Sequence, residues 1–367
     1  MLDPVIAFFA GLMRAIGTFF RWLIATIIWP FAAFRTWLRG RGWFIKIPVF
    51  IILILLAMGY MYLFAITQFW SAGDKAKIES YREENIASGG GNKLADGTCQ
   101  PSAMVQAAAD LIDYNVNQST WVPSNPLEKA GLFFVWDWKD TIFFDNRAAF
   151  QLGVNQAVRR TAVELVDRLG RVRGTSSINQ NLQDAREAIN YRENAWLVTL
   201  TPPFLQPSTQ ARMRDARKKL LDFNTELANC RADFDARADN LLQFLDRITG
   251  DIGSTSEILQ RQIEAANFTG FDRRADDRFW FTYGQLYAYY GILAAARADF
   301  HDVVRQRNLD AIWNRVDEQL GDALRVRPFI VANGSTNTII KSHLESIGFN
   351  LLRVRSNLVE IRDVLDR

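Results

Sequence analysis

Residues 213–248 read MRDARKKLLDFNTELANCRADFDARADNLLQFLDRI, and apolar side chains recur along them at alternating spacings of three and four. This spacing places the apolar residues on one face of a helix and is typical of coiled-coil heptads. One charged residue, Arg237, interrupts the series. We therefore predict one long helix over residues 213–248, whose seam consists of Met213, Ala216, Leu220, Phe223, Leu227, Cys230, Phe234, Leu241, Phe244 and Ile248.

The C-terminal segment has the same spacing, from Ile340 to Leu365, and Asn337 or Thr338 can cap that helix. Strand signals are almost absent from the chain. The fold class is therefore predicted to be all-α, a long-helix bundle with coiled-coil-like heptad seams. Further helices are expected over residues 101–117, 146–169, 178–192, 276–307 and 309–326.

A separate apolar run, IPVFIILILLAMGYMYLFAITQFW, covers residues 47–70. No charged residue occurs between Lys46 and Asp74. As a helix, these 24 residues would extend ~36 Å, which is enough for a hydrocarbon core of ~30 Å. Aromatic residues gather toward its end, as in an interfacial belt. Residues 47–70 are therefore predicted to be one transmembrane helix.

The charges suggest an orientation for this helix. The net charge of the chain is +3, but residues 1–46 carry six basic residues against Asp3 alone. The positive-inside rule then places residues 1–46 on the cytoplasmic side of the membrane and the C-terminal domain outside the cytoplasm, which is the periplasm beyond the inner membrane if the protein is bacterial. The remainder of the chain is slightly acidic, which argues against nucleic acid as a partner.

Residues 1–46 also contain an amphipathic pattern. A narrow stripe of small and polar residues, which includes Arg14 and Arg21, runs along a broad apolar helix. Such a helix suits the membrane interface, with both arginines reaching the lipid phosphates. The alternative is a second span in which the stripe packs on a partner helix.

A linker, residues 71–98, contains the stretch SGGGNKLADGT, and residues 99–367 form the predicted periplasmic domain.

Three segments of that domain carry a resemblance. They are DNRAAFQLGVNQAVRR (residues 145–160), ADDRFWFTYGQLYAYYGIL (residues 275–293) and PFIVANGSTNTIIKSHL (residues 328–344). In this order they resemble a bacterial family of membrane-anchored proteins that is catalogued only as a domain of unknown function. The resemblance implies a Gram-negative source and one N-terminal anchor. It implies no activity, so it assigns no catalytic residue.

A dense group of aromatic residues is the first candidate site. Such side chains at helical spacing form either a hydrophobic core or a pocket for a lipid, glycan or peptide, since tyrosine combines an apolar ring with a polar tip. The group occurs in residues 275–293 and comprises Phe279, Trp280, Tyr283, Tyr287 and Tyr290.

Three carboxylates, Asp137, Asp140 and Asp145, form the second candidate site. They could bind a divalent cation or act as an acid–base pair. Their spacing matches no calcium loop, however, and Lys139 and Arg147 are near in sequence. The alternative is a solvated loop or a helix cap.

Catalysis has little support in the sequence. The two histidines, His301 and His343, stand alone, and no Gly-x-Ser-x-Gly motif occurs. We therefore expect no enzyme, no cofactor and no metal.

The two cysteines, Cys99 and Cys230, could form a disulfide, because the periplasm is oxidising. The alternative is that Cys230 is a small apolar side chain within the predicted seam.

Two functions remain. The first is an adaptor that is anchored in the lipid bilayer and docks protein partners of the cell envelope. The second is a periplasmic ligand-binding or sensory module that uses the aromatic pocket and signals through a partner. The sequence leaves the oligomeric state open.

Overall fold

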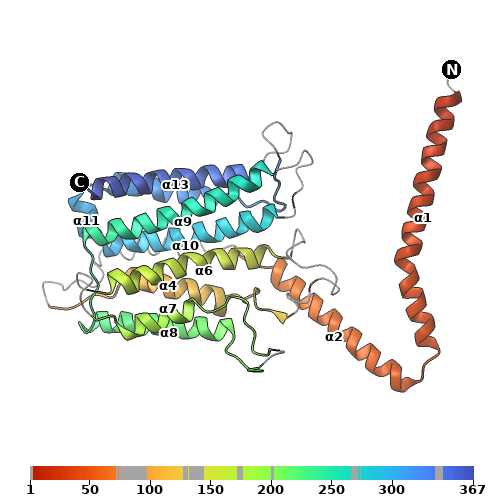
Figure 1. Cartoon of the computed structure of the whole chain (residues 1–367), viewed down its shortest axis with the longest axis horizontal. Coiled ribbons are helices and arrows are strands. Elements are labelled where there is room, and N and C mark those ends of the chain that lie inside the picture. Colours follow the sequence, from red (N-terminus) through yellow and green to blue (C-terminus); the bar gives the residue numbers. More distant parts are fainter. Residues whose placement is uncertain are drawn as a thin grey trace. The chain divides into compact units, whose positions relative to one another are not determined.

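The computed structural model shows a helical chain that divides into two compact units (Figure 1). The first unit is Met1–Tyr62 and the second is Leu63–Arg367. The residues that the structure describes are 3–71, 73, 97–126, 131, 144–171, 177–199, 202–265, 272, 274–334 and 342–367.

Two long helices make up the N-terminal part. They are α1 (Asp3–Arg39), which continues through Pro30, and α2 (Trp43–Gln68). Among the described helices, α2 is the one that is long and apolar enough to cross a membrane. The side chains of Arg14 and Arg21 in α1 are exposed. The last turns of α2, from Leu63, belong to the second unit, so the predicted boundary after residue 70 falls inside that unit.

The second unit is a helical bundle, and its described residues contain no strand beyond an isolated bridge between Val198 and Leu205. This confirms the all-α prediction. Its helices are α4 (Ala103–Asp113), α6 (Asn146–Glu164), α7 (Gln180–Ile189), α8 (Thr209–Ala228), α9 (Ala238–Glu264), α10 (Ala275–Asp299), α11 (His301–Gln306), α12 (Asp310–Ala323) and α13 (His343–Leu365), with π-helical turns η1 (Tyr114–Gln118) and η3 (Leu165–Leu169) after α4 and α6.

The single helix predicted over residues 213–248 is wrong. The chain forms α8 and α9, which are separated by a turn in which Cys230 takes a left-handed φ of 58°. Such a φ ends a helix. Cys230 is therefore exposed and is not part of a seam, and Arg237 stands directly before α9. Apolar spacing reports which residues face the core, and it continues across a turn when the helices on both sides pack on the same core.

Two other boundaries also differ from the expectation. The helix predicted over residues 276–307 divides at Phe300 into α10 and α11. The cap of α13 is Ser342, whose Oγ accepts a hydrogen bond from the backbone N–H of Glu345 at 3.2 Å. The residues expected to cap it, Asn337 and Thr338, lie outside the described ranges. The apolar face of α13 is buried as predicted, while coiled-coil pairing of the seams stays a prediction.

Helices α6 and α10 approach each other at two glycines. A Cβ atom added to Gly153 of α6 would lie 2.0 Å from the carbonyl oxygen of Phe281 in α10. A Cβ atom added to Gly284 of α10 would lie 2.1 Å from the carbonyl oxygen of Phe150 in α6. The two backbones are therefore in reciprocal contact, which only glycine allows at both positions.

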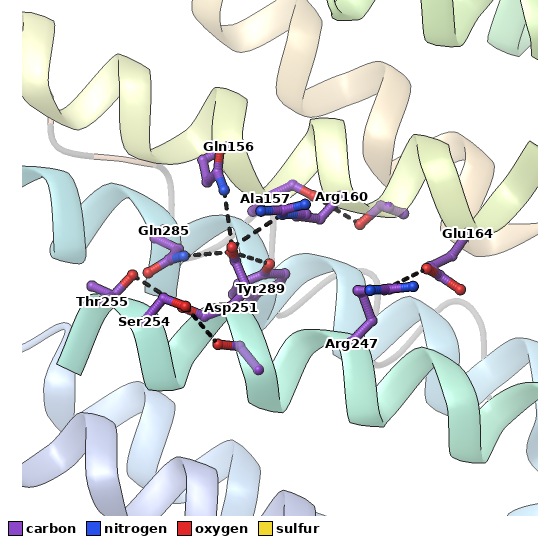
Figure 2. A network of polar contacts seen from close by, with 12 residues as sticks. Gln156, Ala157, Arg160, Glu164, Arg247, Asp251, Ser254, Thr255, Gln285 and Tyr289 are labelled. Atoms are coloured by element: carbon purple, nitrogen blue, oxygen red, sulfur yellow. Dashed lines mark hydrogen bonds and ion pairs between the residues drawn. The ribbon is translucent and has the colours of Figure 1, made fainter. Parts of the chain in front are cut away.

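A buried carboxylate joins the same two helices to α9 (Figure 2). One oxygen of Asp251 accepts hydrogen bonds from Gln156 Nε2 at 2.9 Å and Arg160 Nε at 3.1 Å. The other accepts from Gln285 Nε2 at 2.6 Å and Tyr289 OH at 2.7 Å. Burial, followed by the charge of Asp251, raises the pKa of Tyr289. Four donors from α6 and α10 compensate for the burial of one charge.

A disulfide lies before the start of α4 and after the end of α8, at the end of the bundle opposite Trp70. Cys99 and Cys230 are bonded, with their Cα atoms 5.4 Å apart. Nearby, the buried carboxylate of Asp299 accepts hydrogen bonds from Ser102 Oγ at 2.6 Å and from the backbone N–H of Ala103 at 2.8 Å. Burial raises the pKa of Asp299 to about 6, although these bonds oppose that change. The end of α10 thereby caps the start of α4.

The glycine contact predicts a clear stability effect. Gly284→Ala should reduce the free energy of unfolding by ~1–3 kcal/mol, because the added methyl group has to push two backbones apart. The matched control is Gly321→Ala in α12, where nothing lies within 4 Å of the added Cβ atom. That control should be neutral or stabilising by up to ~1 kcal/mol. Thermal and urea unfolding of the full chain in detergent would measure both, and equal effects would contradict the close contact.

Candidate functional site

The aromatic residues predicted as a pocket lie in the core of the second unit. Phe279, Trp280, Tyr283, Tyr287 and Tyr290 are all on α10 and are at most 7% exposed. Four of them, all except Tyr290, join rings from three other segments. We call this group the aromatic cluster, and it consists of Trp70, Tyr114, Phe150, Phe279, Trp280, Tyr283 and Tyr287.

Trp70, two residues after the end of α2, is the member that sequence reasoning missed. Its ring centroid lies 5.2 Å from that of Phe150 and 5.3 Å from that of Trp280. The sequence suggested an interfacial belt residue, because Trp70 closes the apolar run, and no pattern in the chain points to this contact. A ligand that entered the aromatic cluster would have to compete with Trp70, and ligand binding there stays a prediction.

The chain directly after Trp70 is held by Tyr114. The hydroxyl of Tyr114 donates to the carbonyl oxygen of Ser71 and accepts from the backbone N–H of Gly73 at 3.1 Å. Gly73 has a φ of +87°, and a Cβ atom there would lie 2.3 Å from the ring of Tyr287. Glycine is therefore required at residue 73, for both conformation and space. The start of the predicted linker thus packs on the bundle, while its residues 74–96 lie outside the described ranges.

A buried arginine holds the last turns of α2. Arg147 donates through one guanidinium nitrogen to the carbonyl oxygen of Ile66 and through another to Ser119 Oγ at 2.6 Å. A cation at a helix C-terminus is favourable because the last carbonyl groups carry partial negative charge. Leu63 and Thr67 are buried on the same turns. The end of α2 is therefore part of the bundle core.

The hydroxyl of Tyr283, in the aromatic cluster, and the imidazole of His343, which lies against Phe279, make structural hydrogen bonds. Tyr283 OH donates to the carbonyl oxygen of Leu324 at 2.8 Å and accepts from Arg327 Nε at 2.7 Å. Burial raises the pKa of Tyr283, so its hydroxyl stays protonated. His343 Nδ1 accepts from the backbone N–H of Ala332 at 2.9 Å, and burial lowers the pKa of His343. Both side chains are thus held neutral by their surroundings.

Asp276, in the first turn of α10, is a further buried group that the sequence did not reveal. It is 1% exposed, and no side chain in the described part donates a hydrogen bond to it. Burial, followed by the charge of Asp277, raises the pKa of Asp276 to about 8. The carboxyl group therefore keeps its proton at neutral pH, which lowers the cost of burying it.

The other predicted candidates do not come together at one site. Asp137 and Asp140 lie outside the described residues, and Asp145 is buried directly before α6. His301 lies at the surface, 3.6 Å from Asp302. Within the described ranges, no three His, Cys, Asp or Glu side chains are grouped so that they could hold a metal ion.

A cavity of about 310 Å³ lies near the disulfide-bearing end of the bundle. It is lined by residues between α8 and α9 and by the α10–α11 junction, including Arg237, Asp299, Phe300 and Arg307. None of the predicted aromatic or carboxylate candidates contributes to its lining.

Two adjacent aromatic residues provide a test of the anchor contact. Trp70→Ala should destabilise the helical domain by ~2 kcal/mol or more, because it leaves a cavity against Phe150 and Trp280. Phe69→Ala should have little effect, because Phe69 is 77% exposed. Thermal unfolding and protease resistance of the full chain in detergent would measure both variants. If Trp70 were only a belt residue, the two substitutions would have the same small effect.

Comparison with known protein families gives a match. Residues 42–272 match a family described as an uncharacterized protein conserved in bacteria, DUF2333. The matched region contains α2 and the first of the three segments that carried the resemblance, and the other two segments lie beyond it. No curated protein matches the chain. No solved structure matches it either. Because the match covers more than half of the sequence, the chain belongs to this uncharacterized bacterial family.

Proposed function

We propose that the chain is an adaptor that is anchored in the bacterial inner membrane by α2. In this proposal, residues 1–46 lie on the cytoplasmic side, with Arg14 and Arg21 at the lipid phosphates. The helical domain lies in the periplasm and docks protein partners of the envelope, and no catalytic step is involved.

One observation carries the proposal, namely the way in which α2 ends. A passive anchor needs only an apolar helix and a tether. Here the last turns of α2 are buried in the bundle, Trp70 packs in the aromatic cluster, and Arg147 binds the carbonyl oxygen of Ile66. A domain that buries the end of its anchor in its own core is suited to the docking of other membrane-bound or envelope proteins close to the bilayer.

A candidate docking surface lies on α13. Phe349 and Leu352 are 61% and 49% exposed and stand one turn apart on the side of α13 that faces away from the core. Arg353 lies over the ring of Phe349, with its guanidinium carbon 5.6 Å from the ring centroid. Aromatic and arginine side chains, such as Phe349 and Arg353, are enriched in the cores of protein–protein interfaces.

The alternative function, a ligand-binding or sensory module, has one specific observation in its favour. The aromatic cluster contains Trp70, which lies two residues after the candidate span. A ligand that displaced Trp70 would therefore change the attachment of α2. The two functions differ in the ligand. A sensory module would bind a small molecule at the aromatic cluster, whereas an adaptor would bind a protein at α13.

The orientation can be tested with single cysteines in the full chain. In Cys99→Ala, the remaining thiol of Cys230 is exposed and should react with a membrane-impermeant maleimide once the outer membrane is permeabilised. In a Cys99→Ala, Cys230→Ala background, Gly42→Cys should react only after the cells are lysed. Gly42 tolerates the change, because nothing lies within 4 Å of an added Cβ atom. The reverse pattern of labelling would contradict a periplasmic domain.

The adaptor function predicts a partner that depends on α13. A photo-crosslinking residue at Phe349 should give a discrete protein adduct in cells, and the double variant Phe349→Asp, Leu352→Asp should lose the protein that co-purifies in mild detergent. The matched control is Arg325→Asp, an exposed position in the turn after α12. A co-purifying protein that is retained by the double variant, or the absence of any adduct at Phe349, would contradict docking at α13.

A further inference from the structure

The connection between α7 and α8 is a short hairpin with an apolar surface. Its two arms pair through the backbone, from Thr199 N–H to Phe204 O at 3.0 Å and from Gln206 N–H to Leu197 O at 3.0 Å. Although paired, the arms expose large apolar side chains on both sides. The exposed fractions reach 62% and 67%, and the residues are Trp196, Leu197, Val198, Phe204 and Leu205.

This hairpin lies at the end of the bundle where α2 enters (Figure 1). Tyr114 holds the residues after α2. It is the first residue of the segment 114–121, which also contacts α8 and the base of the hairpin. Arg214, in the second turn of α8, donates to Asn117 Oδ1 at 2.8 Å. Trp121 Nε1 donates to the carbonyl oxygen of Glu193, at the base of the hairpin, at 3.1 Å. The same segment thus positions both the anchor and the hairpin.

Basic and aromatic side chains flank the base of the hairpin. The guanidinium carbons of Arg192 and Arg212 lie 5.8 Å and 5.5 Å from the ring centroid of Tyr191. Arginine and tyrosine next to exposed tryptophan and phenylalanine are typical of protein segments at the headgroup level of a bilayer. The charge also complements anionic lipid phosphates.

A second apolar segment lies at the same end of the bundle. Phe329 is 84% exposed, and Ile330 next to it is 39% exposed. Arg327, two residues earlier, is tied to Tyr283 of the aromatic cluster. Two separate loops therefore present apolar side chains at the end of the domain that α2 enters.

We propose that this end of the domain rests on the lipid bilayer, with the two arms of the hairpin, residues 196–199 and 202–205, inserted into the headgroup region. We call this end the membrane-facing end. The hairpin is a lipid-binding element, because it lies at the same end of the domain as the last turns of α2, from Leu63, where the chain leaves the proposed anchor. Arg192 and Arg212 bind the lipid phosphates above it. The proposal rests on the proposed anchoring through α2.

Fluorophores at three single cysteines in the full chain test this proposal. The native cysteines are bonded to each other and do not react. The test position is Phe204→Cys in the hairpin. Leu55→Cys, on an exposed position of α2, reports the anchor, and Asp302→Cys, at the other end of the bundle, reports the aqueous phase. Each labelled protein is reconstituted into vesicles of phosphatidylethanolamine and phosphatidylglycerol that contain spin-labelled lipid as a quencher.

The expected result is quenching of at least about twofold at residues 204 and 55, and none at residue 302. Quenching at residue 55 without quenching at residue 204 would overturn the lipid-binding hairpin and leave the anchor in place. No quenching at residue 55 would overturn the anchor itself, and the hairpin proposal with it. A third outcome would also overturn the proposal. If unlabelled Phe204→Cys formed disulfide-linked dimers and the labelled protein showed no quenching at residue 204, the hairpin would contact a second copy of the chain and not lipid.

The arginines provide a second measurement. Arg192→Glu together with Arg212→Glu should reduce the quenching at residue 204 in vesicles that contain phosphatidylglycerol, and should leave the quenching at residue 55 unchanged. The matched control is Arg305→Glu, an exposed arginine of α11 at the opposite end of the bundle, beside the aqueous reporter position Asp302. Equal quenching at residue 204 in the unsubstituted protein, the double variant and the control would contradict the binding of lipid phosphates by Arg192 and Arg212.

Discussion

The reciprocal contact between Gly153 and Gly284 is the constraint on which the rest of the domain depends. It brings the backbones of α6 and α10 together, so that each helix presents its neighbouring side chains to the other. On one side of the contact, Phe150 meets the rings of α10 and forms the aromatic cluster. On the other side, donors from both helices converge on Asp251 of α9 (Figure 2). A methyl group at either glycine would separate both sets of contacts.

The aromatic cluster has two roles because Trp70 belongs to it. It is part of the hydrophobic core, and it is also the point where the candidate span joins the domain. The rings contact Trp70, the hydroxyl of Tyr114 binds Ser71 and Gly73, and the guanidinium group of Arg147 binds the carbonyl oxygen of Ile66. Stability of the core and attachment of α2 are therefore coupled. A change that loosens one of them also loosens the other.

Two groups of exposed apolar residues in the described part of the domain have different proposed partners. The hairpin arms, residues 196–199 and 202–205, and the segment at Phe329 lie at the membrane-facing end, which suits a lipid surface. Phe349 and Leu352 lie on the outer side of α13, which suits a protein. If both assignments hold, the bilayer sets the position of the domain, and α13 remains available to a partner.

Apolar periodicity and length were sufficient to predict the all-α class, the apolar helix from residue 47 and the buried face of α13, because these depend on local spacing alone. The same periodicity wrongly joined α8 to α9 through Cys230, since residues on both sides of a turn can face one core. The aromatic residues of α10 were identified from the sequence, but Trp70 was not. Its contact with Phe150 joins residues 80 positions apart. Only the close packing of α6 on α10 decides which distant ring lies beside Phe150 and the aromatic residues of α10.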